Sequence, residues 1–472
     1  MVEDKYTKLG SNIMWMLVGN FASKILIFLL IPFYTSQLTT SEFGIADLIT
    51  TTVGLVTPFF SLLISDGILR FTLNEKYDKS QILTISLLIV VAGTICLAIC
   101  SPLILFSSIL KEYKLVFICY YFFEILANVL QQYLKGLNQI RKFVISGIIN
   151  TIVMVVLNIW FLSVLRLGII GYLLAIIIGH IACCVYICFT ADVCKRIIPL
   201  NKIDKKLVKA ILIFTFPLIP NSVSWWVSNS VDKYILTYYW GTELNGVYSI
   251  AYKIPSLLTT ISTIFTSAWQ ISAAVNWGSD ETRRFFSDVY GKYCAIYTII
   301  GTATIMLIEV IARILFSKDF YFAWPYSTIL IFAAVFQALS GFVGTIYTTA
   351  LKTKTIFLTT LTGAIINIIM NFLLIPSFGG YGAAIATLIS YVVVLVYRLF
   401  DSRRIIKLDI NLTRDMFAFA LVALQIVVSC YQITYYHAVN ACVLVAIVIL
   451  YRKNVKDIIE HVYVALKNRG KE

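Results

Sequence analysis

The chain has 472 residues, of which 60% are hydrophobic and only 13% are charged. A soluble globular domain is about half apolar and about a quarter charged, so this composition excludes an ordinary soluble protein and predicts an all-α, polytopic membrane protein. The formal net charge of +14 would fit a nucleic-acid-binding protein, but the basic residues lie mainly in short loops between apolar runs. We therefore expect no nucleic-acid partner.

No signature of metal or cofactor chemistry is present in the sequence. The ten cysteines form no CxxC pair, most of them lie in apolar runs, and the three histidines are scattered. A phosphate-binding loop and paired carboxylates spaced for a metal-dependent glycosyltransferase are also absent from the sequence. We expect a transporter without a cofactor rather than an enzyme, driven by an ion gradient, the membrane potential or the substrate gradient.

Windows of about 20 apolar residues predict about fourteen membrane-spanning helices. Six are predicted in the first half, near residues 11–36, 43–70, 81–107, 115–134, 143–164 and 168–190. Eight more follow, near residues 209–238, 245–272, 290–314, 323–350, 355–376, 381–400, 413–434 and 436–451. The first apolar run continues to Tyr34 without a small-residue cleavage pattern, so it is predicted to be an uncleaved span.

These spans divide the chain into five parts. Residues 1–190 contain spans one to six, and 191–208 form a basic connector. Residues 209–400 contain spans seven to twelve, 401–452 contain the last two, and 453–472 form the tail. Apolar residues recur in the tail at helical spacing beside lysine and arginine. This pattern predicts a basic amphipathic helix on the inner leaflet or, alternatively, a helix that docks a partner.

The distribution of lysine and arginine predicts the orientation of the chain. With the N-terminus in the cytoplasm, thirty of the 38 basic residues fall on the cytoplasmic side, six fall outside and two lie within spans. The cytoplasmic set comprises both termini and the loops near 70–79, 135–142, 195–209, 283–292, 352–354 and 398–414. An error of one span would destroy this asymmetry, so we expect both termini in the cytoplasm.

The stretch from Phe214 to Ile254 carries charge at membrane depth. Asp232, Lys233 and Lys253 lie inside or at the edge of its two apolar runs, where a charge costs roughly 2.5–3.5 kcal/mol on insertion scales. Prolines and a polar run interrupt the first of these two segments: Pro217, Pro220, Asn221, Ser222, Ser224, Ser228, Asn229 and Ser230. Such groups are tolerated where they face protein or water, so this stretch is predicted to form the wall of a transport cavity.

Further candidates lie in the first half of the chain. Lys24, near the middle of the first span, is predicted to bind an anionic group or a coupling carboxylate. The alternative for Lys24 is a structural ion pair with Asp47 or Glu124. Because Glu124 has almost entirely apolar neighbours, it is predicted either to relay a proton or cation or to pair with Lys24.

Two acid–arginine pairs have the spacing i, i+4, which places both side chains on one helix face. For Asp66 and Arg70, near the cytoplasmic end of the second span, an inner-gate ion pair and a topology anchor are equally good interpretations. For Glu309 and Arg313, near the outer end of the ninth span, a structural pair is predicted.

The charged residues of the seventh and eighth spans have different predicted roles. Asp232 and Lys233 are adjacent, so their side chains diverge by about 100° on a helix, and one can face the cavity while the other reaches the outer interface. Lys253 is predicted to bind an anion in the outer half of the cavity. Trp225 and Trp226 are expected to pack or to mark the interface more than to stack on sugars.

Four motifs follow one another along the chain: NIMWMLVGNFASKILIFLLIPFYTSQLTTSEFGIADLITT, SDGILRF, DKYIL and LNGVYSIAYKI. In this ordered set the chain resembles the polysaccharide-transport flippases of the multidrug, oligosaccharidyl-lipid and polysaccharide exporter superfamily, and the resemblance covers nearly its whole length. It implies two six-helix lobes, two additional C-terminal helices, a V-shaped central cavity and alternating access. It also implies a bacterial cytoplasmic (inner) membrane location.

The resemblance implies that the substrate is an undecaprenyl-diphosphate-linked oligosaccharide for O-antigen, capsule or exopolysaccharide synthesis. Lys24, Lys233 and Lys253 would hold the diphosphate. The remaining candidates divide into ion-coupling or gating residues and weaker sugar contacts: Asp47, Asp66, Arg70, Glu124 and Asp232 in the first group, and Trp225, Trp226 and Tyr248 in the second. Expected partners are membrane lipids, a coupling proton or sodium ion, and a polysaccharide polymerase machinery.

Three alternative functions stay open. A multidrug or cation antiporter of the same fold would favour an acidic, aromatic cavity, which the lysines at membrane depth argue against. A lipid-II flippase is the second alternative. A membrane glycan polymerase or ligase is the third, although the sequence lacks the sizeable outward loop expected of one.

Overall fold

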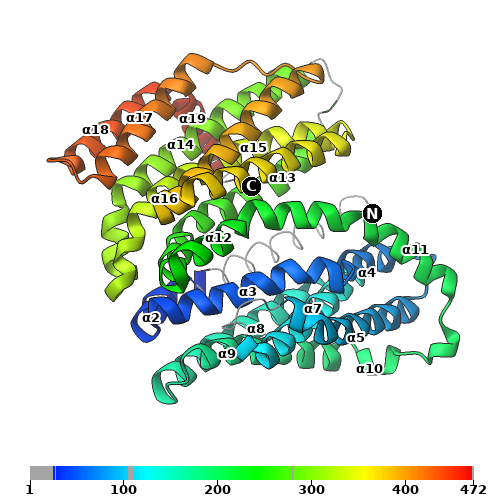
Figure 1. Cartoon of the computed structure of the whole chain (residues 1–472). Coiled ribbons are helices and arrows are strands. Elements are labelled where there is room, and N and C mark those ends of the chain that lie inside the picture. The colour runs from blue at the N-terminus through cyan, green and yellow to red at the C-terminus, as the bar shows by residue number, and fades with distance from the viewer. Residues whose placement is uncertain (1–24, 27, 105–110, 276, 278–280, 470–472) are drawn as a thin grey trace. The chain divides into compact units, whose positions relative to one another are not determined.

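The computed structural model describes residues 25–26, 28–104, 111–275, 277 and 281–469 (Figure 1). Within this part of the chain every regular element is a helix, which confirms the predicted all-α fold class. The chain forms two compact units, Met1–Trp226 and Val227–Glu472, and the division falls within α12 (Ile219–Ala251). The limits predicted for the five parts of the chain stay a prediction.

The first unit is a bundle with one apolar core. Its helices are α2 (Ile31–Gln37), α3 (Thr40–Phe60), α4 (Ile64–Thr72), α5 (Lys79–Ile104), α7 (Lys114–Gly136), α8 (Ile140–Ile159), α9 (Gly168–Thr190), α10 (Val193–Arg196) and α11 (Lys205–Thr215). A π-helical turn at Trp160–Val164 continues α8. The largest fully buried side chains include Phe117, Tyr121 and Tyr133, all on α7, so this helix supplies the centre of the core.

The second predicted span is two helices rather than one. Between α3 and α4, Leu62 and Leu63 have positive φ values of 51° and 50°, which cost roughly 1–2 kcal/mol each for residues with a side chain. Gly93 of α5 packs against this break, where an added Cβ would lie 1.9 Å from the carbonyl oxygen of Phe60. α5 can approach the end of α3 this closely only because Gly93 has no side chain.

The second unit is organised around α15 (Trp324–Thr349). In the membrane-span candidate that contains α15, 89% of the most apolar stretch is buried, and α13, α14, α16 and α17 pack against it. Its other helices are α13 (Lys253–Val275), α14 (Thr282–Leu315), α16 (Thr353–Asp401), α17 (Leu412–Cys430), α18 (Tyr436–Leu450) and α19 (Arg452–Arg469).

Two helices of the second unit contain a glycine break. Gly241 divides α12 with φ 83° and ψ 177°, and Gly379 divides α16 with φ 53° and ψ −127°. Both φ values lie in the region that favours glycine. The breaks are also in contact, because the indole N–H of Trp240 donates to the carbonyl of Ile375 at 2.8 Å and the Trp240 ring lies against Gly379.

Ten helices of the described part are long and apolar enough to cross a membrane, or eleven if the bent pair α18–α19 is one span. The predicted number of fourteen is therefore not confirmed. Two of the ten candidates, 47 and 51 residues long, contain Gly241 and Gly379 and are more than twice the roughly 20 residues that one span needs. The first predicted span lies mostly outside the described residues.

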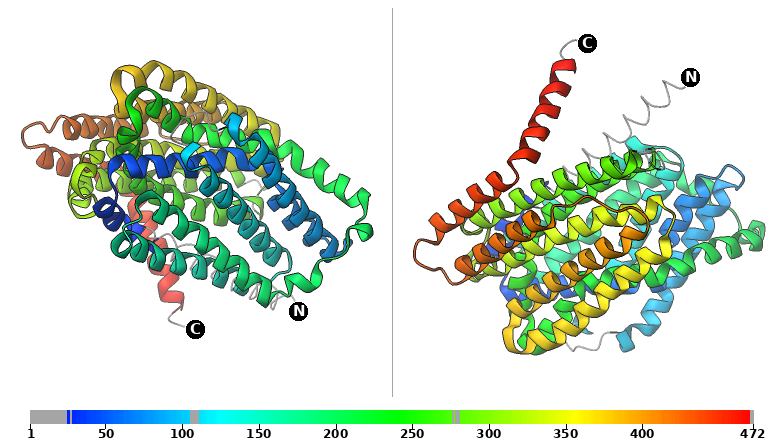
Figure 2. Two further views of the ribbon diagram at one scale, coloured as in Figure 1. Left: turned by 60° about the horizontal axis from the view of Figure 1, so that its bottom comes forward. Right: turned by 90° about the horizontal axis from the view of Figure 1, so that it is seen from above.

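The C-terminal tail is helical from Arg452 to Arg469 and turns away from α18 by 66° (Figure 2). At this bend the hydroxyl of Tyr451 donates to the buried carboxylate of Asp415 at 2.9 Å. Arg414 donates to the side chain of Asn454 at 2.8 Å. The first turn of α19 is thereby fixed to α17, whereas contact of the tail with a membrane stays a prediction.

Replacing Gly379 with alanine is expected to destabilise the protein by about 1–3 kcal/mol. A side chain there would be strained at φ 53°, and its Cβ would lie 3.1 Å from Leu244 and 3.3 Å from Trp240. Thermal unfolding in detergent measures the effect. Gly341→Ala on α15 is the matched control, because its Cβ would meet nothing within 4 Å. Equal melting temperatures of the two variants would contradict the prediction.

Candidate functional site

A buried carboxylate lies at the centre of the polar interior of the second unit. Asp232 is only 2% exposed. Its Oδ2 accepts hydrogen bonds from the hydroxyls of Tyr248 at 2.9 Å and Tyr252 at 3.3 Å, and its Oδ1 accepts from the backbone N–H of Lys233 at 3.0 Å. A buried charge is costly unless such donors satisfy it, so these contacts make the position of Asp232 tolerable.

The break at Gly241 makes this arrangement possible. Asp232 precedes the break, and Tyr248, which is 16 positions after Asp232 in the chain, lies beyond it. In an unbroken helix the two residues would be about 24 Å apart along the axis, far beyond hydrogen-bonding distance. Because the chain folds back at Gly241, the second segment of α12 returns Tyr248 to the carboxylate.

Hydroxyl and amide groups surround the carboxylate in a second layer. The hydroxyl of Tyr252 lies 3.4 Å from Oγ1 of Thr387 on α16, and the hydroxyl of Tyr391 donates to Oδ1 of Asn229 at 2.9 Å. A buried carboxylate within a polar shell is the kind of group that takes up a proton or a small cation inside a membrane protein. The arrangement can therefore serve as an ion site.

The three lysines predicted to hold a diphosphate have different positions. Lys24 lies outside the described residues. Lys233 is half-buried on α12 beside the fully enclosed Asp232, so the two adjacent side chains do diverge. Lys253 is the first residue of α13, also half-buried, and directly follows Tyr252. Lys233 is thus the chain neighbour of Asp232, and Lys253 is the chain neighbour of one of its hydrogen-bond donors.

The candidates of the first unit lie on three helices, α3, α4 and α7. Asp47 is half-buried on α3. Glu124 on α7 keeps its Oε2 buried without a hydrogen-bond partner among the described groups. Asp66 and Arg70 are both exposed on α4, and no ion pair joins them in this part of the chain. The inner-gate and topology-anchor interpretations of these two residues both stay predictions.

The aromatic candidates are mostly packing residues. The indole N–H of Trp226 donates to the carbonyl of Thr51 at 3.0 Å, whereas Trp225 is 48% exposed. Tyr248 is fully buried, and its hydroxyl is engaged by Asp232. The sugar contact of Tyr248 stays a prediction, and spacing alone did not reveal that this residue folds back onto the carboxylate.

The structural pair predicted for Glu309 and Arg313 is confirmed, with 2.5 Å between Oε1 and the guanidinium. Tyr321 also donates to Oε1 at 3.1 Å, and Tyr436 donates to Oε2. Because these donors come from different parts of the second unit, Glu309 joins the start of α18 and the segment after α14 to the body of α14.

Sequence reasoning missed a buried arginine. The loop predicted near 398–414 begins with Arg398, but this residue is only 7% exposed and lies within α16. Its guanidinium donates to the carbonyl of Ser340 at 2.8 Å and to the hydroxyls of Thr359 and Thr360, each at 3.1 Å. Gly344 leaves room for it, since a Cβ there would lie 3.0 Å from Nη1. For a charge near the end of an apolar run, the sequence gives no signal that distinguishes a loop residue from a residue buried within a helix.

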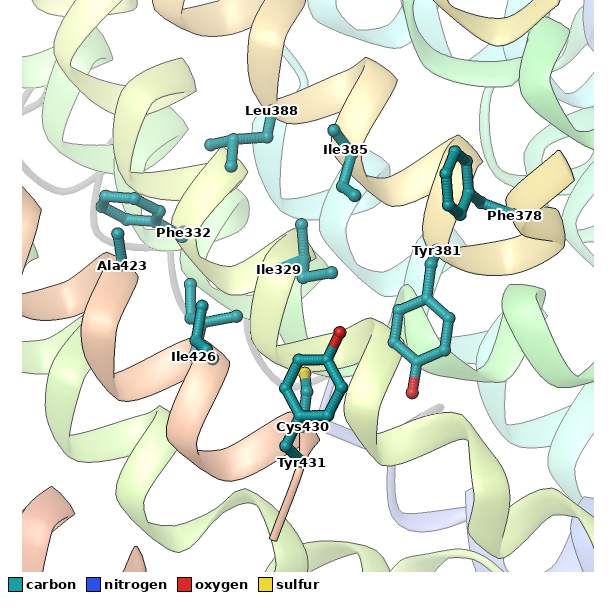
Figure 3. A pocket seen from close by; sticks show the side chains of 11 residues that line it. Ile329, Phe332, Phe378, Tyr381, Ile385, Leu388, Ala423, Ile426, Cys430 and Tyr431 are labelled. Carbon is teal, nitrogen blue, oxygen red and sulfur yellow. The ribbon is translucent and has the colours of Figure 1, made fainter. Parts of the chain in front are cut away.

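An apolar cavity of about 500 Å³ lies within the second unit between α15, the second segment of α16 and α17 (Figure 3). Its lining is almost entirely aliphatic and aromatic, and the figure shows these side chains pointing toward one space from all three helices. The lining includes Ile329, Phe332, Ile385, Leu388, Ala423 and Ile426. A space with such walls favours a hydrocarbon ligand over a polar one.

Comparison with known proteins gives consistent results. The family described as polysaccharide biosynthesis protein matches residues 9–270, more than half of the chain, and the MatE family matches residues 217–373. No curated protein sequence gives a match.

Solved structures show the same fold. A lipid II flippase, MurJ, in an inward closed conformation is similar with a TM-score of 0.70 and 16% identity, over 95% of this chain and 100% of that one. An inward-facing MATE multidrug transporter of the MOP superfamily has a TM-score of 0.67 and 14% identity, over 81% of this chain and 95% of the other. A MOP transporter from Pyrococcus furiosus, described by the reverse polarity of its binding pocket, has a TM-score of 0.56 and 15% identity, over 84% and 94% of the two chains.

Replacing Tyr248 with phenylalanine is expected to destabilise the protein by about 1–3 kcal/mol, because the buried carboxylate of Asp232 loses a donor. In an Asp232→Asn background the same change should cost less, since a neutral amide needs that donor less. Thermal unfolding of the four proteins in this cycle measures the coupling between the two residues.

Tyr326→Phe is the matched control for this cycle. The ring of Tyr326 packs 6.3 Å from that of Tyr248, and its hydroxyl has no hydrogen-bond partner among the described residues. If Tyr248→Phe and Tyr326→Phe had equal effects in both backgrounds, the hydrogen bond to Asp232 would contribute nothing measurable.

Proposed function

The chain belongs to the polysaccharide biosynthesis protein family, and we propose that it moves undecaprenyl-diphosphate-linked oligosaccharides from the inner to the outer leaflet of a bacterial cytoplasmic membrane. The fold supports this proposal, because the chain shares it with flippases and transporters of the MOP superfamily. The carrying observation is that one unit contains both two half-buried helical lysines, Lys233 and Lys253, and an apolar cavity. A lipid with an anionic headgroup requires both kinds of surface.

The lysines supply the charge for the headgroup. Lys233 and Lys253 are half-buried, so each can lose part of its hydration and offer a cation to a diphosphate. Lys24 joins them in the proposal from its sequence position. An anionic ligand repays the cost of holding these charges at membrane depth, which explains their presence in apolar segments.

The apolar cavity suits the lipid part of the substrate. An isoprenoid chain is a hydrocarbon, and every buried CH₂ contributes roughly 0.8 kcal/mol of binding free energy. The cavity between α15, α16 and α17 is lined by side chains that offer few polar groups. We assign this cavity to the isoprenoid units that lie nearest the diphosphate.

The buried carboxylate suits ion coupling. Asp232 is held by two tyrosine hydroxyls next to Lys233, so a proton or sodium ion that binds Asp232 changes the local charge beside the proposed diphosphate site. Ion movement would thereby be linked to release of the headgroup in an alternating-access cycle. Glu124 and Asp47 are the corresponding coupling candidates in the first unit.

A cation antiporter is the second candidate, favoured by the match of residues 217–373 to the MatE family. Asp232 lies within that match and would then bind the transported cation directly. The two functions differ in what the lysines do, because cationic drugs gain nothing from Lys233 and Lys253.

Lys253→Gln is expected to slow the appearance of a lipid-diphosphate oligosaccharide in the outer leaflet of proteoliposomes by about tenfold or more. The reason is that one charge-assisted contact to phosphate, worth about 1.5–3 kcal/mol, is lost. Accessibility of the glycan to an added glycosidase measures the rate.

Lys292→Gln is the matched control, because Lys292 forms an ion pair with the exposed Asp288 on the surface of α14. Full activity of Lys253→Gln would remove this residue from the headgroup site. Failure of the wild-type protein to expose the glycolipid, together with ion-driven efflux of an organic cation, would establish the antiporter instead.

A further inference from the structure

Helix α13 presents three different faces. Its buried face packs on the second unit through side chains such as Leu258, Trp269 and Ala273, which are 6%, 5% and 0% exposed. A second face carries the exposed apolar Ile261 at 42%. The third face is polar and begins at Lys253. It consists of Ser256, Thr259, Thr260, Thr263, Ser267 and Gln270.

The polar residues keep one face because they recur every three or four positions, close to the 3.6-residue period of a helix. Four of them, Ser256, Thr263, Ser267 and Gln270, are exposed. α13 is long enough to cross a bilayer but is not among the ten apolar candidates, since these hydroxyl and amide groups lower its apolar character. Polar side chains along a spanning helix face protein or water rather than lipid.

Hydrogen bonding limits what this face can offer a ligand. The hydroxyl of Ser256 donates to the carbonyl of Lys253 at 2.6 Å, that of Thr263 to Thr259 at 2.9 Å, and that of Ser267 to Thr263 at 2.8 Å. Thr259 and Thr260 both donate to the carbonyl of Ser256. Each hydroxyl has one proton and two lone pairs, so the hydroxyls of this face retain acceptors and have no donor to spare.

We propose that the polar face of α13 is the surface along which the neutral sugars of the lipid-linked oligosaccharide move, an inference that rests on the proposed function. Sugar hydroxyls donate hydrogen bonds, directly or through water, to the lone pairs that Ser256, Thr263 and Ser267 direct outward. A phosphate only accepts hydrogen bonds, so these hydroxyls give it no attraction. The diphosphate is instead served by Lys253 at the start of the same face.

This division gives the substrate an orientation along α13. The anionic group is held where the lysine lies, and the glycan extends beside the hydroxyls that follow it. Individually weak acceptor contacts allow the sugars to pass without being trapped, and they do not select one sugar over another. The face therefore recognises polyhydroxylated chains as a class.

The first test asks whether the face meets water. In a chain with its ten cysteines replaced and its melting temperature retained, Thr263→Cys and Ile261→Cys are labelled with a charged maleimide. We expect labelling of Thr263→Cys alone, slowed by free oligosaccharide released from the substrate. Equal labelling of the two positions, or no effect of the oligosaccharide, would overturn the inference whether or not the protein transports glycolipid.

The second test compares two substrates in proteoliposomes: a lipid diphosphate with one sugar and the same lipid with a complete oligosaccharide. The triple variant Ser256→Ala, Thr263→Val, Ser267→Ala is expected to expose the oligosaccharide about tenfold more slowly and the single-sugar lipid at the wild-type rate. Thr362→Val is the control, since its hydroxyl makes the same kind of bond to the carbonyl of Leu358, but on α16.

The outcomes separate this inference from the proposed function. If the triple variant moves both substrates at the wild-type rate, or slows both equally, the hydroxyl face does not handle the glycan, and the flippase function stands. If the wild-type protein moves neither substrate, the proposed function and the glycan-handling role both fail.

Discussion

A carboxylate inside a membrane protein must find its hydrogen-bond donors within the protein. For Asp232 these donors come from other residues of the second unit. Tyr248 and Tyr252 supply the donors, and Thr387 on α16 lies beside the second tyrosine. The second segment of α12 is thereby fixed to Asp232 directly, and α16 is linked to it through Tyr252. Without these contacts the buried charge would be too costly, so the packing of α12 against α16 and the position of Asp232 depend on each other.

The second unit contains two kinds of polar group: some are enclosed within the protein, and others are directed outward. Asp232 and Arg398 are enclosed, and the protein itself satisfies their main hydrogen-bonding needs. The hydroxyls of α13 are directed outward and retain acceptors. Enclosed groups determine how the helices pack, whereas outward groups determine what the surface can bind. An apolar cavity in the same unit adds a third environment, so one bundle contains both the polar and the apolar surfaces that the proposed amphiphilic substrate requires.

Local sequence patterns predicted the helical fold, whereas the membrane depth of the charged residues stays a prediction. Hydropathy could not predict the break at Leu62 and Leu63, because neither residue is of a type that favours positive φ. Spacing could not pair Tyr248 with Asp232, since this contact depends on the fold-back at Gly241. Lys24 stays a prediction, because it lies outside the described residues. Tertiary contacts, rather than composition, determine the break at Leu62 and Leu63 and the pairing of Tyr248 with Asp232.

The neutral acceptors around Arg398 have a consequence for biogenesis. Its guanidinium is satisfied by Ser340 on α15 and by Thr359 in the first segment of α16, both earlier in the chain. When the second segment of α16 leaves the ribosome and meets the bilayer, its arginine has a place only if those two helices are already inserted and adjacent. The vectorial order of synthesis therefore supplies a preformed acceptor for the charge, and a permuted chain that released this segment first would expose a bare cation to lipid.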